Sequence, residues 1–109
     1  MKIPNKVRIG GVDYEIKTES NVRIGNDLAF GKIDYGDCVI TLSDTDGKNH
    51  QHRCITLWHE ILHGITEHAC LDLPQDDEEK IIDTLAKGIY QVLQDNGAAL
   101  FDLAVEDSK

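Results

Sequence analysis

The segment 56–65, TLWHEILHGI, contains two histidines four residues apart, with a glutamate directly after the first. In a helix of 3.6 residues per turn, the side chains of His59 and His63 project about 40° apart and one turn along, so both imidazoles can bind one ion. Glu60 lies about 100° round from His59, where its carboxylate can take a proton from a metal-held water. The HExxH pattern therefore predicts a zinc site with two histidine ligands and Glu60 as general base.

The plain alternative is that these are surface or core histidines of an ordinary helix. By the residue frequencies, an HExxH pattern arises in roughly one or two per cent of shuffled chains of this composition. Here the pattern falls in the middle of an expected helix, with both imidazoles at the edge of its apolar stripe. A pair of ligands must lie at such an edge, which favours the zinc interpretation.

A catalytic zinc takes three protein ligands and keeps one position open for water. Four residues that follow could supply the third ligand. Glu67 would strain to meet the ion from the same helix, and His68 is poorly aimed on a continuous helix. Glu78 and Glu79 open the next helix, which can fold back antiparallel and present a carboxylate across a groove.

Of these two we favour Glu79, because Asp83 follows it at i+4 on the same helix face. The carboxylate of Glu79 would bind the metal. The carboxylate of Asp83, one turn further on, would hold the far nitrogen of a histidine ligand. Glu78 lies closer to the apolar stripe and remains a rival. Both glutamates could instead merely complement the dipole at the helix N-terminus.

The elements that must position these residues are strands first and helices second. Residues 6–18 alternate around Gly10-Gly11 and predict a hairpin with a two-residue turn. A second hairpin is expected with strands at about 29–34 and 38–42, and either strand could be an exposed edge that binds an extended peptide. Residues 25–27 are expected to form a loop, and 43–47 to supply a helix N-cap.

Apolar residues then recur at helical spacing from about 49 to 69, and Pro74 marks the end of that helix. A second helix is expected from 75 or 76 to 95, with Asn96-Gly97 as its C-terminal stop and a short final helix at 98–105. We expect a buried stripe on the second helix, formed by Ile81, Ile82, Leu85, Ile89, Val92 and Leu93.

These elements predict an α+β fold in one domain of 109 residues, with a small antiparallel sheet of two hairpins at about 6–46 packed against two main helices within 47–109. Cys38, Cys54 and Cys70 are odd in number and form no CxxC pair, which fits reduced thiols. With no hydrophobic leader and no apolar run of membrane-spanning length, we expect a cytoplasmic protein.

The charge is uneven along the chain. Residues 1–55 hold eight acidic and eight basic side chains, whereas 56–109 hold twelve acidic residues and three lysines. An acidic half repels phosphate backbones, so we expect no nucleic-acid partner, and it can help to collect a divalent cation. Nothing in the sequence indicates the oligomeric state.

The HEILH pentad, followed by a helix with Glu79 and Asp83, resembles the gluzincin class of zinc peptidases. The chain as a whole resembles short phage- and prophage-type HExxH proteins near the ImmA/IrrE metallo-endopeptidase family, on the segments 31–35, 56–65 and 78–96. The resemblance implies a zinc metallopeptidase with a peptide or protein substrate, in which His59, His63 and a downstream glutamate bind zinc and Glu60 is the catalytic base. Larger members carry extra helices around a substrate groove, for which this chain has little material.

Two other classes of function stay open. The chain could be a zinc-stabilised interaction module without turnover, because a small core benefits from a metal, or a phage protein that binds a host regulator with neither metal nor activity. Among other residues, Trp58 is expected in the core. Gly64 could allow the second helix to approach closely. Tyr35 could stabilise an oxyanion or simply belong to a turn.

Overall fold

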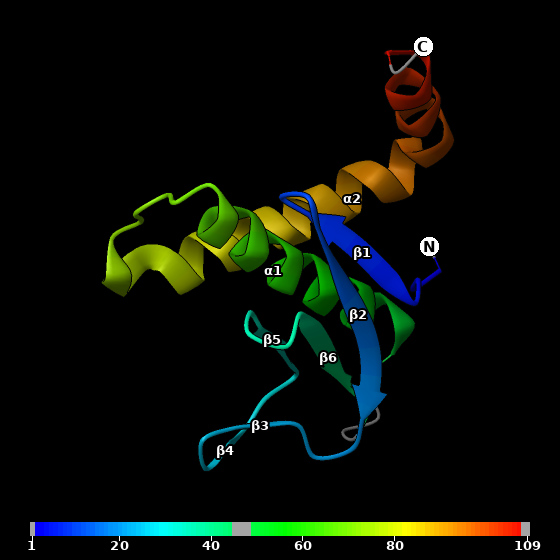
Figure 1. Cartoon of the computed structure of the whole chain (residues 1–109). Helices are drawn as coiled ribbons and strands as arrows, with labels where there is room; N and C mark the ends of the chain where they lie inside the picture. Colours follow the sequence, from blue (N-terminus) through cyan, green and yellow to red (C-terminus); the bar gives the residue numbers. More distant parts are fainter. Residues whose placement is uncertain (1, 45–48, 108–109) are drawn as a thin grey trace.

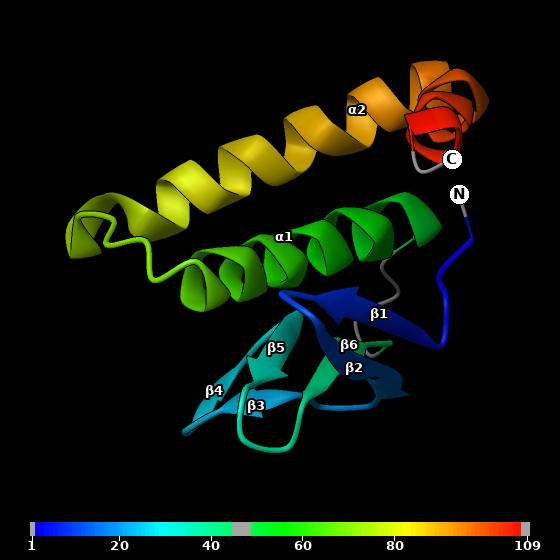
Figure 2. The same cartoon turned by 45° about the horizontal axis from the view of Figure 1, so that its top comes forward.

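The fold is α+β and has three layers. The computed structural model describes residues 2–44 and 49–107. A four-stranded sheet forms the first layer, helix α1 (His50–His68) lies on one of its faces, and helix α2 (Gln75–Asp107) lies on α1 (Figures 1 and 2). Within the described residues α2 packs against α1 and not against the sheet. The expected packing of the sheet against the helices is thus confirmed, with α1 in direct contact with the sheet and α2 lying on α1.

Both expected hairpins are confirmed. Strands β1 (Lys6–Ile9) and β2 (Val12–Glu19) pair antiparallel around Gly10 and Gly11, whose φ angles of 58° and 81° suit the primed turn that two glycines predict. Strands β5 (Gly31–Asp34) and β6 (Val39–Ser43) form the second antiparallel pair. Alternating side chains of these strands face α1 and form the core with it.

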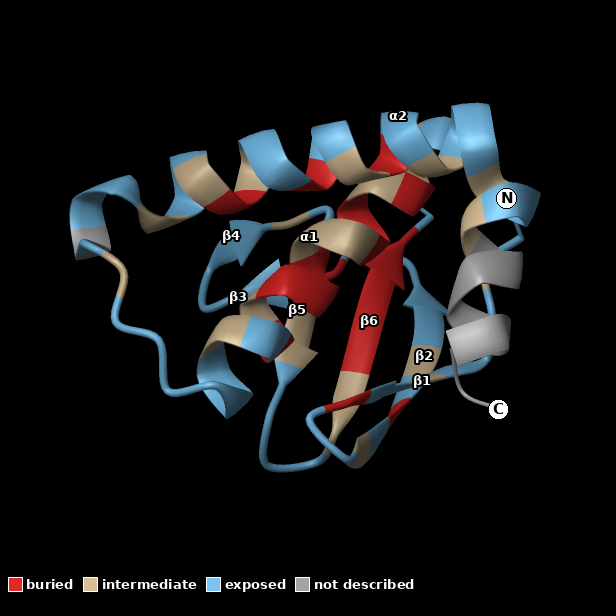
Figure 3. Cartoon of the chain, turned by 90° about the horizontal axis from the view of Figure 1, so that it is seen from above, coloured by how far each residue is buried: buried red, intermediate tan, exposed pale blue. Residues whose placement is uncertain are grey.

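The sheet is mixed rather than antiparallel, which corrects the expectation. Its order is β1-β2-β6-β5, and β2 runs parallel to β6. Strand β6 is therefore an inner strand, and Ile40 and Leu42 on it are fully buried (Figure 3). Of the two strands considered as a free edge, β5 lies at the edge and β6 does not.

The expected loop at 25–27 is the turn of a third, very short hairpin. Strands β3 (Arg23–Ile24) and β4 (Asp27–Leu28) form this two-stranded ribbon, with Gly25 at a φ of 63°. It lies next to β5. Of the segment expected to supply the cap of α1, residues 45–48 lie outside the described residues, and the N-cap is Asn49, whose Oδ1 accepts a hydrogen bond from the His52 N–H at 2.8 Å.

Helix α1 is held closely against the sheet. A Cβ added to Gly64 would stand 2.9 Å from Cδ1 of Ile9 and 3.3 Å from Cδ1 of Ile33, so this glycine allows the sheet to approach, and not the second helix as expected. Trp58 is half-buried and packs against both hydrophobic clusters, the one between sheet and α1 and the one between α1 and α2. The expectation of a core tryptophan is thus confirmed in part.

Helix α2 begins directly after Pro74 and runs back along α1 (Figure 2). Its contact with α1 is centred on Ile82 and Ala86, which are 1% and 0% exposed and pack on Leu62. Leu85 and Val92 are 50% and 52% exposed. The expected buried stripe is therefore wrong at these two positions, because among the described elements α2 packs against α1 and not against the sheet.

The stop expected at Asn96-Gly97 is also wrong. Helix α2 continues through these residues to Asp107, so the residues 98–105 belong to it and form no separate helix. The Asn96 side chain donates a hydrogen bond to the carbonyl of Val92 at 3.0 Å, within the helix. The helix bends in this region (orange in Figure 1), and glycine is a common cause of such bends. Within the described residues no helix is long and apolar enough to cross a membrane.

Candidate metal centre

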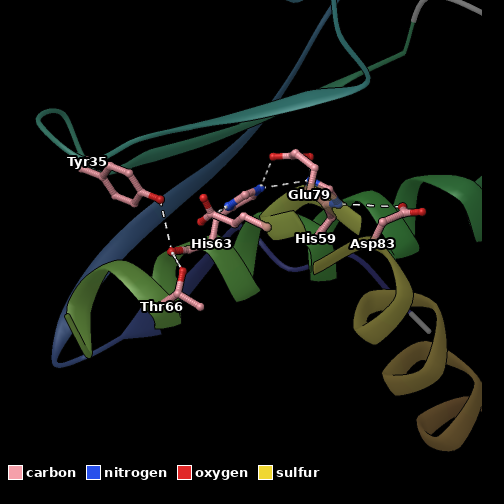
Figure 4. Close-up of polar contacts among 7 residues, drawn as sticks. Tyr35, His59, His63, Thr66, Glu79 and Asp83 are labelled. Carbon is pink, nitrogen blue, oxygen red and sulfur yellow. Dashed lines mark hydrogen bonds and ion pairs between the residues drawn. The ribbon is translucent and has the colours of Figure 1, made fainter. Parts of the chain in front are cut away.

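Two histidines of α1 and one glutamate of α2 converge at one point (Figure 4). The Nε2 atoms of His59 and His63 are 3.2 Å apart. The carboxylate of Glu79 lies across both, with Oε2 at 3.1 Å from Nε2 of His59 and Oε1 at 2.8 Å from Nε2 of His63. In the described part of the chain, this is the one group of three such side chains whose donor atoms lie within 4.8 Å of one another.

The donor set suits a tetrahedral metal ion. Zinc bonds of about 2.0–2.1 Å to nitrogen and oxygen place the ligand atoms of a tetrahedron about 3.3–3.4 Å apart. The separations of 2.8–3.2 Å seen here are slightly shorter, as expected when the three groups bond to one another rather than to an ion between them. Two imidazoles and one carboxylate leave the fourth position of such an ion without a ligand from these residues.

Further carboxylates lie behind both histidines. Nδ1 of His59 is 3.9 Å from Asp83, and Nδ1 of His63 is 3.7 Å from Glu78. These distances exceed a hydrogen bond, but each carboxylate is on the side from which a metal-bound imidazole is usually oriented. The rivals from the sequence thus occupy different places, with Glu79 between the two Nε2 atoms and Glu78 behind one ring. Lys87 pairs with Asp83 at 3.0 Å.

Burial and the neighbouring carboxylates shift the pKa of His59 in opposite directions. Its side chain is 19% exposed, and this burial lowers its pKa, with a further lowering from the neighbouring His63. Glu79 and Asp83 oppose the shift by favouring the imidazolium. The net lowered pKa keeps His59 neutral at physiological pH, which is the form that binds a metal.

Glu60 is a buried acid at the same site. The residue is 6% exposed, and burial, helped by the charge of Glu79, raises the pKa of its carboxyl to about 7. Strand β5 covers it at Gly31, where an added Cβ would stand 3.5 Å from Oε2 of Glu60, 2.8 Å from Cγ2 of Thr56 and 3.0 Å from the carbonyl oxygen of Thr41. A glycine is needed there, and sequence reasoning missed it.

Tyr35 bridges the β5–β6 turn and α1. Its hydroxyl donates a hydrogen bond at 3.1 Å to the carbonyl of His63, which also accepts one from Thr66 at 2.9 Å (Figure 4). Burial and nearby acids, foremost Glu67, raise the pKa of Tyr35 to about 12, so the phenol is protonated at physiological pH. The residue is therefore more than a turn tyrosine, because it fixes the turn to the backbone of a predicted metal ligand.

The two candidate ligands rejected from the sequence lie outside the cluster. Glu67 and His68 are exposed, and Nε2 of His68 forms a hydrogen bond of 2.7 Å with the hydroxyl of the buried Tyr14. The ring of His68 also packs on Gly10, in the turn of the first hairpin. His68 thus joins the end of α1 to the sheet, and no local sequence pattern indicates this long-range contact.

The cluster opens into a groove between the free edge of the sheet and the two helices. The cavity is about 1080 Å³. Residues of β5, α1, α2 and the β3–β4 ribbon line it, among them Gly31, His59, Glu60, His63 and Glu79. Both Glu60 and the three clustered side chains therefore face the same accessible space.

Comparison of the chain with protein-family models, curated proteins and solved structures gives no significant match.

Proposed function

We propose that the protein is a zinc-dependent peptidase of the gluzincin type, with His59, His63 and Glu79 as ligands. The observation that carries the proposal is the meeting of three zinc-ligand atoms beside a buried glutamate and an open groove. A simple ion pair between Glu79 and a protonated histidine would account for one contact between the helices. It accounts for one imidazole only, whereas Glu79 lies within 3.1 Å of the Nε2 atoms of both histidines.

Zinc at this position would polarise a substrate carbonyl and lower the pKa of a water molecule towards about 7. The chain supplies the proton transfers. Glu60 accepts a proton from the attacking water as the water oxygen bonds to the carbonyl carbon. It then gives that proton to the leaving nitrogen as the C–N bond breaks. Burial and the charge of Glu79 raise the pKa of this carboxyl to about 7 in the metal-free chain, and a cation held beside it would favour the carboxylate that accepts the proton.

Strand β5 offers a place for an extended substrate. The N–H of Ser43 bonds to the carbonyl of Phe30 at 2.8 Å, so in the alternating antiparallel ladder the peptide groups of Gly31 and Ile33 point away from β6. Within the described residues β5 is hydrogen-bonded to a strand on one side only. A peptide added to this edge would lie in the groove beside Glu60.

The direct test is turnover by the zinc-loaded protein. Cleavage of a mixed peptide library, followed by mass spectrometry, should be abolished by chelation and restored by zinc. Glu60→Gln should lower the cleavage rate by at least about 100-fold, and this variant should still bind zinc. Glu67→Gln, an exposed position on the same helix, should change neither. If the zinc-loaded protein cleaves no peptide in the library, the proposal is wrong.

A second function is favoured by the way α2 is attached. In the described residues α2 contacts α1 alone, and Glu79 joins the two helices at the cluster. Zinc there could serve as a structural link in an interaction module without turnover. Chelation separates the two functions. An interaction module should have a fourth protein ligand on the zinc ion, and it should lose the contacts between α2 and α1 and unfold when zinc is removed. A peptidase should have an open position on the ion and should keep its fold without zinc.

A further inference from the structure

The groove continues beyond the metal centre to an apolar end. There the ring of Phe30 packs edge-on against that of His52, with ring centroids 4.7 Å apart. Phe30 is 48% exposed and Ile24, on the β3–β4 ribbon, is 60% exposed, and both line the cavity. Large apolar side chains that are exposed in a concave site are suited to contact a ligand.

The same cavity gathers basic side chains, although the chain has a net charge of −9 and only 11 lysines and arginines. Arg23, Lys32 and Lys87 all line it. The ammonium of Lys32 donates to the carbonyl of Arg23 at 3.4 Å, so these two basic residues lie side by side. Lys87 approaches from α2 and is paired at 3.0 Å with Asp83. The acidic side chains of the cavity are Asp34, Glu60, Glu79 and Asp83.

The order of contacts fixes where this basic end lies. Glu78 is near His63 and Asp83 is near His59, so α2 runs antiparallel to α1, and Lys87 lies further towards the N-terminus of α1. His52 is seven residues before His59, or about 10 Å along the helix. An extended peptide covers that distance in about three residues.

We propose that the end of the groove at Phe30 and His52, the basic subsite, binds a carboxylate of the substrate peptide about three residues from the bond that is cleaved, together with an apolar neighbour. Charge complementarity carries the proposal, because Arg23 and Lys32 present adjacent cations beside apolar contacts in an otherwise acidic chain, whereas Lys87 is paired with Asp83. The inference rests on the proposed peptidase function. The carboxylate could belong to an aspartate or glutamate side chain or to the C-terminus of a peptide.

Binding can be measured without turnover on the full chain with Glu60→Gln, loaded with zinc. Fluorescent octapeptides with a central Ala-Leu pair would carry Glu or Gln three residues from the pair on either side. Two further peptides, without Glu, would have their C-terminus at that position, one as a free acid and the other as an amide. We expect about three- to tenfold tighter binding of the peptide with Glu, or of the free acid over the amide, with the arm that responds identifying the source of the carboxylate.

The variant Arg23→Gln/Lys32→Gln should lose this preference, and 0.5 M salt should weaken it. Lys17→Gln, an exposed lysine of β2 away from the cavity, is the matched control and should keep it. Zinc affinity should be the same in all three proteins. Equal binding of acidic and neutral peptides, or no binding of any peptide, would overturn the basic subsite. Acid-selective binding by a protein that cleaves nothing would overturn the peptidase function alone.

Discussion

Oε1 of Glu79 lies 2.8 Å from Nε2 of His63, across the contact between α2 and α1. The neighbouring Glu78 instead lies 3.7 Å from Nδ1 of the same ring. The carboxylates of two adjacent residues thus lie next to different nitrogens of one imidazole. If a metal ion binds at Nε2 and an orienting group lies at Nδ1, the two glutamates should have different effects on zinc affinity.

We expect Glu79→Gln to weaken zinc binding by more than about 100-fold, because it removes a ligand charge. Competition with a chromogenic chelator would measure the affinity. Glu78→Gln is the matched control at the adjacent position, and it should cost about tenfold at most. Equal losses at the two positions would contradict the assignment of Glu79 as the third ligand.

Asp83→Asn should weaken zinc binding about 10- to 100-fold, as typical for a carboxylate behind a metal-bound histidine. Asp83 faces Nδ1 of His59 at 3.9 Å, and a bound ion would draw the ring and the carboxylate closer. Asp77→Asn, at an exposed position near the start of the same helix, should leave the affinity unchanged. A loss no larger than that of this control would show that Asp83 has no part in orienting the ring.

The buried Glu60 should make the metal-free protein less stable as the pH rises. Its folded-state pKa of about 7 lies above the unfolded value of 4.5, so the folded state binds more protons between these values, and stability is lost as the pH rises from about 4.5 to 7. Gln at this position has no such titration. Relative to the native chain, Glu60→Gln should therefore gain about 2 kcal/mol more in unfolding free energy at pH 8 than at pH 5.

Urea denaturation in the presence of a chelator measures this difference, with Glu67→Gln as a control that replaces an exposed glutamate of the same helix. A gain that is the same at pH 5 and pH 8 would mean that the carboxyl of Glu60 is not perturbed by burial.

Gly31→Ala should reduce both stability and activity. The added methyl group would meet the carbonyl of Thr41 at 3.0 Å and Cγ2 of Thr56 at 2.8 Å, so β5 or α1 must shift at the position of Glu60. We expect a cost of about 1–3 kcal/mol in unfolding free energy, as for other overpacked sites. At Gly88, in α2, an added Cβ meets nothing within 4 Å, and Gly88→Ala should instead stabilise by about 0.5–1 kcal/mol. Thermal unfolding of both variants would show whether the signs differ.

Much of the local structure could be predicted from short patterns. The turn at Gly10-Gly11 and the HExxH spacing each act through neighbours in sequence, and both hairpins and α1 follow from such neighbours. The convergence of Glu79 with the histidines was also anticipated, because a helix that folds back after Pro74 must bring its first turns opposite the C-terminal half of α1.

What the sequence could not show depends on distant partners. The parallel pairing of β2 with β6 joins two hairpins that have no local signal for each other. At Asn96-Gly97 the usual stop signal was overridden, because the Asn96 side chain bonds to Val92 inside the helix and a mid-helix glycine costs only about 1 kcal/mol. Leu85 shows the same limit, since its exposure depends on what α2 packs against.

The central claim is that His59, His63 and Glu79 bind one zinc ion. Crystals of the zinc-loaded protein, measured on both sides of the zinc absorption edge, would test it most directly. We predict a single anomalous peak about 2.0–2.2 Å from Nε2 of each histidine and from a carboxylate oxygen of Glu79, with a fourth position open to the groove. A map with no peak between these three side chains, or a peak bound elsewhere, would contradict the account.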